Sequence, residues 1–405
     1  MKLRTRRRKL WWIVGSVALV LAVVSAGAWY VIAQNTTKTS EVKTAETVKK
    51  TLQPVSIQSN SLFTGNSFFG RNINQWSMAS PLKTAYPFSR LNEFHRDQYD
   101  AWITGLECPT VAGFKQTVAQ EEATLSFNCS PDYLPEAAKW FTAVTLANNH
   151  TDNRGAEGFA ETRRQLDANG IQYFGHYDPE VLEDVCEVIS YPVSVTYEDG
   201  SVKKEHMPVA LCGFHGVFKI PSQEALSQME KYSKLMPVIA MPHSGAEYTA
   251  TPDQIKTASY RSMIDHGADM VLGDHPHWIQ TTEAYKGKLI VYSMGNFMFD
   301  QQDSTEVTRS AAIRVLMANT GSTSESLKKW LALGEICKTY HDMCLQEAQD
   351  QKLEKIPLTY SFGVIGTSDA GKITKPATAA EQAAIEKRLV WAPTMLQLKA
   401  PYKSL

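Results

Sequence analysis

The chain has 405 residues, a formal net charge of −1 at pH 7, and a composition that is 43% hydrophobic and 20% charged. These values are typical of a folded protein with one large or two ordinary domains, and they argue against a disordered chain. Because no global basic field is present, they also argue against a nucleic-acid partner.

The N-terminus predicts a membrane anchor. A basic segment, residues 1–9, precedes residues 10–33, which hold no charged side chain. A helix of that length rises about 36 Å, enough to cross a hydrocarbon core of about 30 Å. Trp and Tyr residues stand near both ends, as at membrane interfaces. The basic flank predicts a cytoplasmic N-terminus, with the chain after residue 33 outside the cell and the protein in the cell membrane.

A cleaved signal peptide is the alternative for this segment. Residues 25–28 (SAGA) are small, as a cleavage site requires. The apolar stretch is longer than the hydrophobic region of a usual signal peptide, which favours an uncleaved anchor.

Six cysteines suit an extracellular domain, where disulfides persist. Sequence alone does not fix their connectivity, and six separate buried thiols remain an alternative. No pair has the CxxC spacing of zinc ribbons or thioredoxins. The pairs that we consider are Cys337 with Cys344, which are close in sequence, and then Cys108 with Cys129 and Cys186 with Cys212.

Residues 34–57 are rich in Thr, Lys and Glu and predict a solvated extracellular stalk. The main domain is expected over residues 58–321, where short apolar runs alternate with helical patterns, which indicates α/β layers. The expected strands are residues 61–64, 102–103, 141–146, 209–212, 237–241, 270–272 and 289–293. The expected helices are residues 155–169, 222–235 and 252–266.

Two details complete the expected elements. Pro252 suits the first turn of its helix, with Thr251 before it as the N-cap. Residues 322–405 predict a peripheral, mostly helical C-terminal extension, with helices over residues 325–336 and 379–388 and polar linkers such as residues 366–375.

Polar side chains follow five of the expected strands. In an open α/β sheet, binding sites form at the carboxyl ends of the strands. Imidazole, carboxylate and amide oxygen are all able to bind a divalent metal, and the proline between two histidines fixes the intervening φ. The strand-end residues are Asn66, Glu107, Asn148, Asn149, His150, His243, Asp274, His275 and His277.

Three segments carry a resemblance to a known family: residues 146–150 (LANNH), 267–277 (GADMVLGDHPH) and 292–297 (YSMGNF). The residues of these segments and their order along the chain resemble the motifs of the CapA family, the poly-γ-glutamate capsule proteins, within the calcineurin-like metallophosphoesterase superfamily. The resemblance covers residues 60–303.

The resemblance implies a metallophosphoesterase-like four-layer α/β/β/α sandwich with a metal cleft for one or two divalent ions (Mn, Fe, Zn or Mg). It implies hydrolysis, because such ions lower the pKa of bound water and stabilise an oxyanion. By this analogy Glu107 bridges two ions, Asn149, His243 and His275 hold one, and Asn66 and His277 hold the other. His150 lies beside the substrate and donates a proton or hydrogen bond to the leaving oxygen. Asp274, Asn296 and Asn148 orient ligands or line the cleft.

The sequence departs from the family pattern at two positions. Asn66 stands where the family has a metal-binding Asp, and Gly105 stands where it usually has Asn. An amide is neutral and a weaker ligand than a carboxylate, so we expect one metal site to be retained and the other to be weak or empty.

Several of the site residues also have a plain structural interpretation. Asn149 and His150 could cap the following helix, His243 could be a turn residue, His275 and His277 ordinary loop residues, and Glu107 a surface carboxylate.

Three functions stay open. The first is a membrane-tethered metal-dependent hydrolase or transferase in the biosynthesis, export or anchoring of capsule or poly-γ-glutamate. The second is a non-catalytic scaffold with a degraded metal site. The third is a solute-binding or adhesion module. The expected partners are an anionic envelope polymer, membrane synthase or export subunits, and the bilayer around residues 10–33.

Overall fold

The computed structural model describes residues 52–339 and 343–405, apart from the side chains of residues 338 and 339. The predicted basic segment, the anchor over residues 10–33 and most of the predicted stalk lie outside the described residues. Within the described ranges, no helix has both the length and the apolar character needed to cross a bilayer.

The described residues form a mixed α/β structure in which 15 strands share one hydrogen-bonded network. The strands are β1 Pro54–Ser67, β2 Ala101–Leu106, β3 Ala143–Thr145, β4 Gln172–Phe174, β5 Cys186–Tyr197, β6 Val202–Gly216, β7 Val238–Ser244, β8 Met270–Leu272, β9 Thr282–Tyr285, β10 Lys288–Val291, β11 Asn296–Met298, β12 Arg309–Asn319, β13 Leu358–Ser368, β14 Lys375–Pro376 and β15 Tyr402–Ser404.

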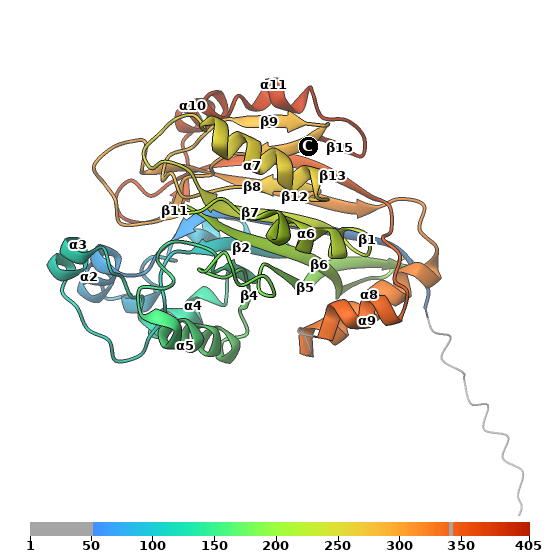
Figure 1. Cartoon of the computed structure of the whole chain (residues 1–405), viewed down its shortest axis with the longest axis horizontal. Helices are drawn as coiled ribbons and strands as arrows, with labels where there is room; N and C mark the ends of the chain where they lie inside the picture. Colours follow the sequence, from blue (N-terminus) through green and yellow to red (C-terminus); the bar gives the residue numbers. More distant parts are fainter. Residues whose placement is uncertain (1–51, 340–342) are drawn as a thin grey trace, which may run out of the picture. The chain divides into compact units, whose positions relative to one another are not determined.

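Helices cover the strands on more than one side (Figure 1). The α-helices are α2 Arg71–Ala79, α3 Val118–Thr124, α4 Leu134–Ala137, α5 Gly155–Ala168, α6 Gln223–Ser233, α7 Gln254–Asp265, α8 Ser324–Thr339, α9 Cys344–Asp350, α10 Ala379–Leu389 and α11 Trp391–Met395. Short 3₁₀ turns are η1 Lys83–Ala85, η2 Leu91–Phe94, η3 Arg96–Gln98 and η4 Pro131–Tyr133.

Strand β1 is the branch point of the network. Its first residues pair antiparallel with β5, its middle pairs antiparallel with β12, and its second half pairs parallel with β2. Leu62 and Phe63 are consecutive on β1 and both fully buried, yet they belong to two different hydrophobic clusters. Because successive side chains of a strand point to opposite faces, β1 separates these two cores.

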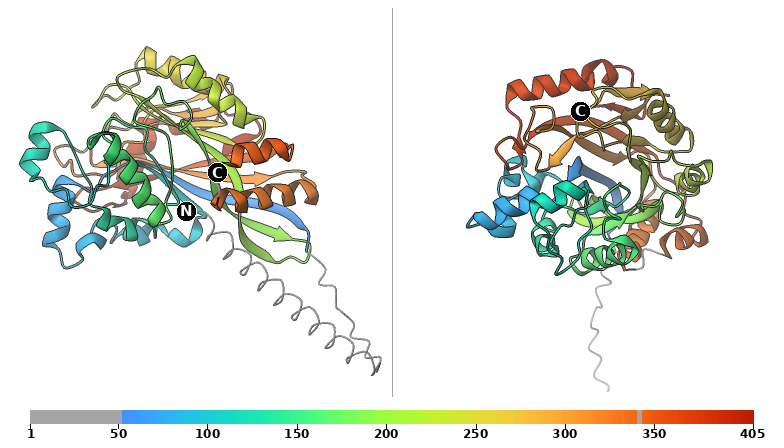
Figure 2. Two further views of the ribbon diagram at one scale, coloured as in Figure 1. Left: turned by 60° about the horizontal axis from the view of Figure 1, so that its bottom comes forward. Right: turned by 60° about the vertical axis from the view of Figure 1, so that its left-hand side comes forward.

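The first core lies under helices α2 to α5, which gather beside β2, β3 and β4 (Figure 2). The second core holds the inward side chains of β5 to β8 together with those of α6 and α7. Strands β6, β7 and β8 are parallel and are connected through α6 and α7, so their carboxyl ends lie at one edge.

All seven predicted strands and the three predicted helices of the main domain occur in the structure. Two of the strands are much longer than predicted, since β1 covers Pro54–Ser67 rather than residues 61–64 and β6 covers Val202–Gly216 rather than residues 209–212. The predicted start of α7 was wrong. Asp253, not Thr251, is the N-cap, because its side chain accepts a hydrogen bond from the backbone N–H of Lys256 at 2.7 Å. Strand β1 begins at Pro54, so the last residues of the expected stalk belong to the sheet.

The C-terminal segment, residues 322–405, contains the expected helices α8 and α10 but also a long strand that was not predicted from the sequence. Strand β13 pairs antiparallel with β12 along its full length, from Leu358 opposite Asn319 to Ser368 opposite Arg309. The strands β5 and β12 were also not predicted. Each of the three pairs antiparallel with long neighbouring strands, outside the strand–helix alternation on which the prediction depended.

All three cysteine pairs named from the sequence form disulfides. Cys108–Cys129, Cys186–Cys212 and Cys337–Cys344 have Cα separations of 5.8, 4.0 and 5.2 Å. The alternative of six free thiols is therefore wrong. Cys186 and Cys212 lie directly opposite each other in the β5–β6 ladder, so this disulfide links two neighbouring strands of the second core.

Candidate functional site

The backbone brings the ends of β1, β2 and β11 together. Asn66 is paired with Asn296 in the parallel β1–β11 ladder, and its N–H donates to the Gly295 carbonyl at 3.2 Å. The N–H of Glu107, just past β2, donates to the Ser67 carbonyl at 2.9 Å. The side chains of Asn66, Glu107 and Asn296 are therefore held at one edge of the network, and all three are buried.

A second group forms around His243 at the end of β7. Its Nδ1 lies 2.7 Å from Asp274 Oδ1, and its Nε2 lies 2.8 Å from Asn149 Oδ1 and 3.0 Å from His275 Nδ1. An isolated backbone bridge between His243 and Asp274 continues the parallel pairing of β7 with β8. His243 Nε2, Asn149 Oδ1 and His275 Nδ1 thus lie close together, and all three can carry a lone pair. At most one imidazole proton is available to form a hydrogen bond among them.

A third group forms around His277. Its Nδ1 lies 2.8 Å from Asn296 Oδ1 and 3.4 Å from Asn66 Nδ2. Its Nε2 lies 3.9 Å from an oxygen of Glu107 and 3.9 Å from an oxygen of Glu247. His277 therefore connects strand-end residues from β1, β2 and β7 with the loop that follows β8.

The His275-Pro276-His277 segment has a strained backbone. His275 has φ 93° and His277 has φ 58°, in the left-handed region that favours glycine. Such conformations cost of order 1–3 kcal/mol per residue and persist where the surrounding structure imposes them. Here both imidazoles are buried, and each is within hydrogen-bonding distance of another site residue. The strained backbone conformation is therefore the one that directs both imidazoles into the site.

Asn148 and His150 lie beside this cluster. Asn148 Oδ1 accepts hydrogen bonds from the N–H groups of His150 and Thr151 at 3.0 and 3.1 Å, and its Nδ2 donates to the Leu106 carbonyl at 2.8 Å. Asn148 therefore fixes the turn that carries His150. The His150 ring packs on Phe127 with a centroid distance of 4.4 Å, and its burial lowers the pKa to about 4. His150 is consequently neutral at pH 7.

Burial makes the charged forms of the ionisable side chains in the site unfavourable. Burial, followed by the charges of Asp274 and Glu247, raises the pKa of Glu107 well above its usual value. Burial raises the pKa of Asp274 to about 7, and burial lowers the pKa of His243 well below its usual value. Both oxygens of Glu107, Asn66 Oδ1 and Asp274 Oδ2 are buried with no hydrogen-bond partner. Leaving such atoms unpaired is costly, so they mark a place for a ligand.

These observations test the expected metal site. Among His, Cys, Asp and Glu side chains of the described residues, no group of three is placed to hold a metal ion by itself. The implied ligand set also includes the amides of Asn66 and Asn149, which approach His277 and His243. Gly105 leaves space for this set, because Asp274 Oδ2 lies 2.7 Å from where its Cβ would be. The unpaired oxygens and facing lone pairs fit a divalent cation.

Several residues at this edge were not predicted from the sequence. Arg71, at the start of α2, donates to both carboxylate oxygens of Asp300 at 3.0 and 2.6 Å. Lys256 is buried, its Nζ has no hydrogen-bond partner, and burial lowers its pKa to about 7 against the opposing charge of Asp274. Glu247 faces His277. In the sequence, Glu247 could have been recognised as a site residue from its place in the strand-end segment that begins at His243.

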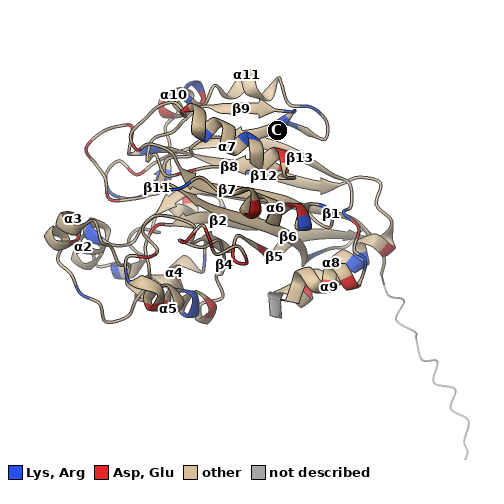
Figure 3. Cartoon of the chain, in the orientation of Figure 1, with Lys and Arg blue, Asp and Glu red and all other residues tan. Residues whose placement is uncertain are grey.

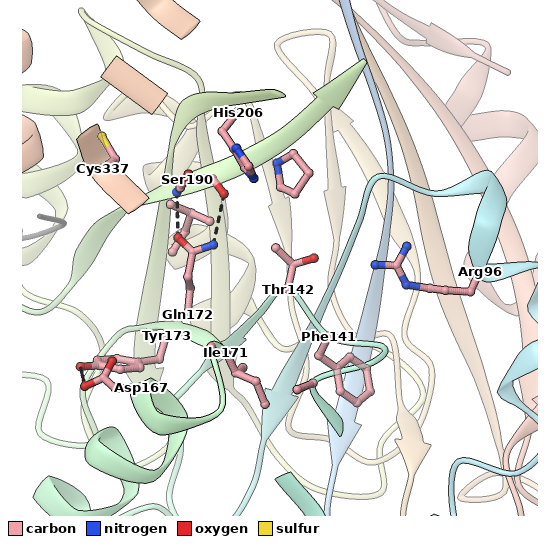
Figure 4. A pocket seen from close by; sticks show the side chains of 14 residues that line it. Arg96, Phe141, Thr142, Asp167, Ile171, Gln172, Tyr173, Ser190, His206 and Cys337 are labelled. Carbon is pink, nitrogen blue, oxygen red and sulfur yellow. Dashed lines mark hydrogen bonds between the residues drawn. The ribbon is translucent and has the colours of Figure 1, made fainter. Parts of the chain in front are cut away.

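A separate hollow of about 470 Å³ lies at the amino ends of β3 and β4 (Figure 4). It is lined by Arg96, Gln172 and His206 among others, and by none of the predicted site residues. Gln172 spans the opening between β4 and β5 by bonding both backbone groups of Ser190. Charged residues of both signs are spread over the helices and loops of the described part of the chain (Figure 3).

The fold and the site together define a class: α/β proteins with a buried polar site of imidazole, amide and carboxylate groups at the carboxyl ends of the strands. The chain belongs to the family described as bacterial capsule synthesis protein PGA_cap, whose model matches residues 60–301. This confirms the family resemblance seen in the sequence.

Two curated relatives carry related names. The capsule biosynthesis protein CapA of Bacillus anthracis is 24% identical over 331 residues, which cover 79% of this chain and 75% of the relative. The PGA biosynthesis protein CapA of Bacillus subtilis (strain 168) is 32% identical over 177 residues, covering 40% of this chain and 43% of that protein. The solved structure of TT1561 of Thermus thermophilus aligns over 63% of this chain and 93% of that chain, at 10% identity and a TM-score of 0.33, too low to carry an argument.

Proposed function

We propose that this protein acts in the biosynthesis, export or anchoring of capsule or poly-γ-glutamate at the cell envelope, through metal-dependent hydrolase or transferase chemistry. The family membership supports the role in capsule biosynthesis. The observation that carries the chemistry is the meeting of His243, His275 and Asn149, beside the buried, unpaired carboxyl of Glu107.

The architecture that we propose is the metallophosphoesterase-like four-layer α/β/β/α sandwich. The two hydrophobic clusters on either side of β1 support it, since one lies under α2 to α5 and the other holds α6 and α7.

Asn149, His243 and His275 would hold one divalent ion, with Glu107 reaching it from β2. Such an ion supplies a Lewis acid and a bound water of lowered pKa. Asp274 keeps His243 oriented through its Nδ1, which leaves Nε2 for the ion.

His150 would lie beside the substrate and give a proton or hydrogen bond to its leaving oxygen. Its Nδ1–H donates to Asn153 Oδ1 at 3.1 Å, so the ring orientation is fixed by a side chain outside the metal-ligand set and Nε2 is the nitrogen left for the substrate. Burial lowers the pKa of His150 to about 4, so Nε2 is unprotonated at pH 7 in the free protein, and donation to the leaving oxygen requires that His150 first take up a proton.

We also propose that residues 10–33 anchor the chain in the cell membrane, with residues 1–9 in the cytoplasm and the described domain outside. The three disulfides support an extracellular location. An anionic envelope polymer and the membrane subunits that make or export it are the partners that this placement favours.

A non-catalytic, polymer-binding scaffold is the second candidate. The observation that favours it is Asn66, a neutral amide where the family has a carboxylate ligand.

Hydrolysis of generic phosphodiesters by the purified full chain, with and without Mn²⁺, separates the two candidates. In cells, His150→Ala should strongly reduce polymer output if the chemistry is required. His95→Asn is the control, because His95 is exposed and Asn tolerates its left-handed φ of 55°. Unchanged polymer output in the His150 variant, together with no Mn²⁺-dependent hydrolysis, would favour the scaffold.

A further inference from the structure

The ring of His277 has a defined orientation. Its Nδ1–H donates to Asn296 Oδ1 at 2.8 Å, so Nε2 carries the free lone pair. That nitrogen lies 3.9 Å from Glu107 Oε1 and 3.9 Å from Glu247 Oε1. Two atoms bound to one ion at about 2.1 Å lie about 3–4 Å apart. The spacing of Nε2 from each carboxylate therefore suits a shared cation.

Glu247 is held toward His277 by its neighbour Tyr248. The N–H of Tyr248 donates to the Pro276 carbonyl at 2.9 Å, and its ring stacks on His277 with a centroid distance of 5.6 Å and an interplanar angle of 20°. The loop after β7 is thus attached to the His-Pro-His loop at two points.

Tyr248 is also connected to Asn296, the hydrogen-bond partner of His277, through the side chain of Gln301. Gln301 donates to the Tyr248 hydroxyl at 2.8 Å and accepts from Asn296 Nδ2 at 3.0 Å. Asn296 in turn orients His277. The position of Glu247 beside His277 is therefore part of a connected set of contacts.

The buried, unpaired oxygens near His277 also favour a bound cation. Glu107 is 1% exposed, and both its oxygens lack partners, as does Asn66 Oδ1. The nearby cation Arg71 is committed to Asp300 through two hydrogen bonds. Among the described residues, no Lys or Arg forms an ion pair with Glu107 or Glu247.

We propose that Glu247 is a ligand of a second divalent cation, which it holds together with His277, Glu107 and Asn66. The amide of Asn66 is part of this set because the His, Asp and Glu side chains of the described residues are not placed to hold an ion by themselves. Glu247 supplies the carboxylate that Asn66 lacks, so the second site is occupied rather than weak or empty as the sequence alone suggested. This inference rests on the proposed metal-dependent function. It adds a ligand from the loop after β7, whose side chain is 41% exposed and reaches the site from the solvent side.

Metal binding tests the inference without any activity assay. The full chain is purified, stripped of metal and titrated with Mn²⁺ by calorimetry, and the bound metal is counted after gel filtration. The wild-type chain should bind two Mn²⁺ ions, with the spin-coupled electron paramagnetic resonance signal of a dinuclear site. Glu247→Gln should retain one ion, lose the coupled signal and weaken the second site by more than about tenfold.

Two further variants make the result specific. Glu230→Gln is the matched control, because Glu230 lies 3.9 Å from His266 Nε2 with a similarly exposed side chain, outside the site. It should bind two ions. Adding Asn66→Asp to Glu247→Gln should restore the second ion, because it supplies a carboxylate to the same ion site from β1.

The outcomes separate the two proposals. A wild-type chain that binds one ion, or a Glu247→Gln variant that still binds two, overturns the inference and leaves the proposed function standing. A wild-type chain that binds no Mn²⁺ overturns the metal-dependent function and the inference with it.

Discussion

His243 and Asp274 are joined by both backbone and side chain. The two residues form a parallel bridge beyond β7 and β8, and His243 Nδ1 lies 2.7 Å from Asp274 Oδ1. A carboxylate in this position selects the imidazole tautomer with its proton on Nδ1. The lone pair of Nε2 is thereby directed at Asn149 and His275.

Asp274→Asn should therefore weaken the binding of the first Mn²⁺ ion by about 10- to 100-fold, since the hydrogen-bond partners of ligand histidines have effects of that size. The change keeps the side-chain shape, so the melting temperature of the metal-free chain should change little. Calorimetric titration measures the affinity. Asp303→Asn, at an exposed position, is the control. Equal Mn²⁺ affinities for the two variants would contradict the orienting role of Asp274.

Lys256 should give the protein a stability that rises with pH. Burial lowers its pKa to about 7 in the folded state, whereas the unfolded chain has a value near 10.4. Between those values the unfolded state binds more protons, so stability increases with pH, by up to about 1.4 kcal/mol per pH unit.

Lys256→Met should remove this dependence. Relative to the wild type, the variant should be stabilised more at pH 7.5 than at pH 9.5, because the cost of burying the amine falls as pH rises. Thermal melting of the metal-free chains at the two pH values measures the difference. A parallel pH dependence of the two melting temperatures would show that Lys256 does not titrate as described.

Gly65→Ala should destabilise the fold by about 2 kcal/mol or more, because a Cβ at this position would collide with the backbone carbonyl of Gly295. That carbonyl accepts the Asn66 N–H, so backbone movement there would also separate β1 from β11. Gly363→Ala is the control, since its nearest neighbour is the flexible Leu405 side chain at 3.3 Å. Comparison of melting temperatures decides; similar values for the two variants would refute the steric argument.

Removing the Cys186–Cys212 disulfide by a double substitution with alanine should lower the unfolding free energy by about 3.5 kcal/mol, as expected for a closed loop of this length. The two cysteines are 26 residues apart and bridge β5 to β6. Thermal melting of the variant against the oxidised wild type measures the loss. If the melting temperature were unchanged, the disulfide would contribute no stability.

Much of the site's location could be predicted from the sequence. The apolar runs that became β1, β2, β3, β7 and β8 are short and bounded by polar residues, and parallel pairing places their ends together. Asn66, Glu107, Asn149, His243, His275 and His277 follow those runs directly. Their convergence is thus a consequence of strand direction, which a sequence pattern indicates well.

Other features depend on contacts between distant segments. Strand β13 could not be assigned from the strand–helix alternation, because its partner β12 is an antiparallel neighbour that was itself not predicted. Glu247 was visible in the sequence, but its approach to His277 depends on the stacking of Tyr248 and the hydrogen bond to Pro276. The N-cap of α7 differed because Asp253, one residue after Pro252, competes better for the free N–H groups than Thr251.

The branching of β1 has a consequence for any attempt to divide the molecule. Its start is paired with β5 of the second core, while its other end carries Asn66 beside β2 and β11. A fragment containing either core alone would therefore lose a central strand or expose a bare sheet edge. Split reporters and circular permutants of this protein should accordingly be cut in surface loops that leave β1 intact.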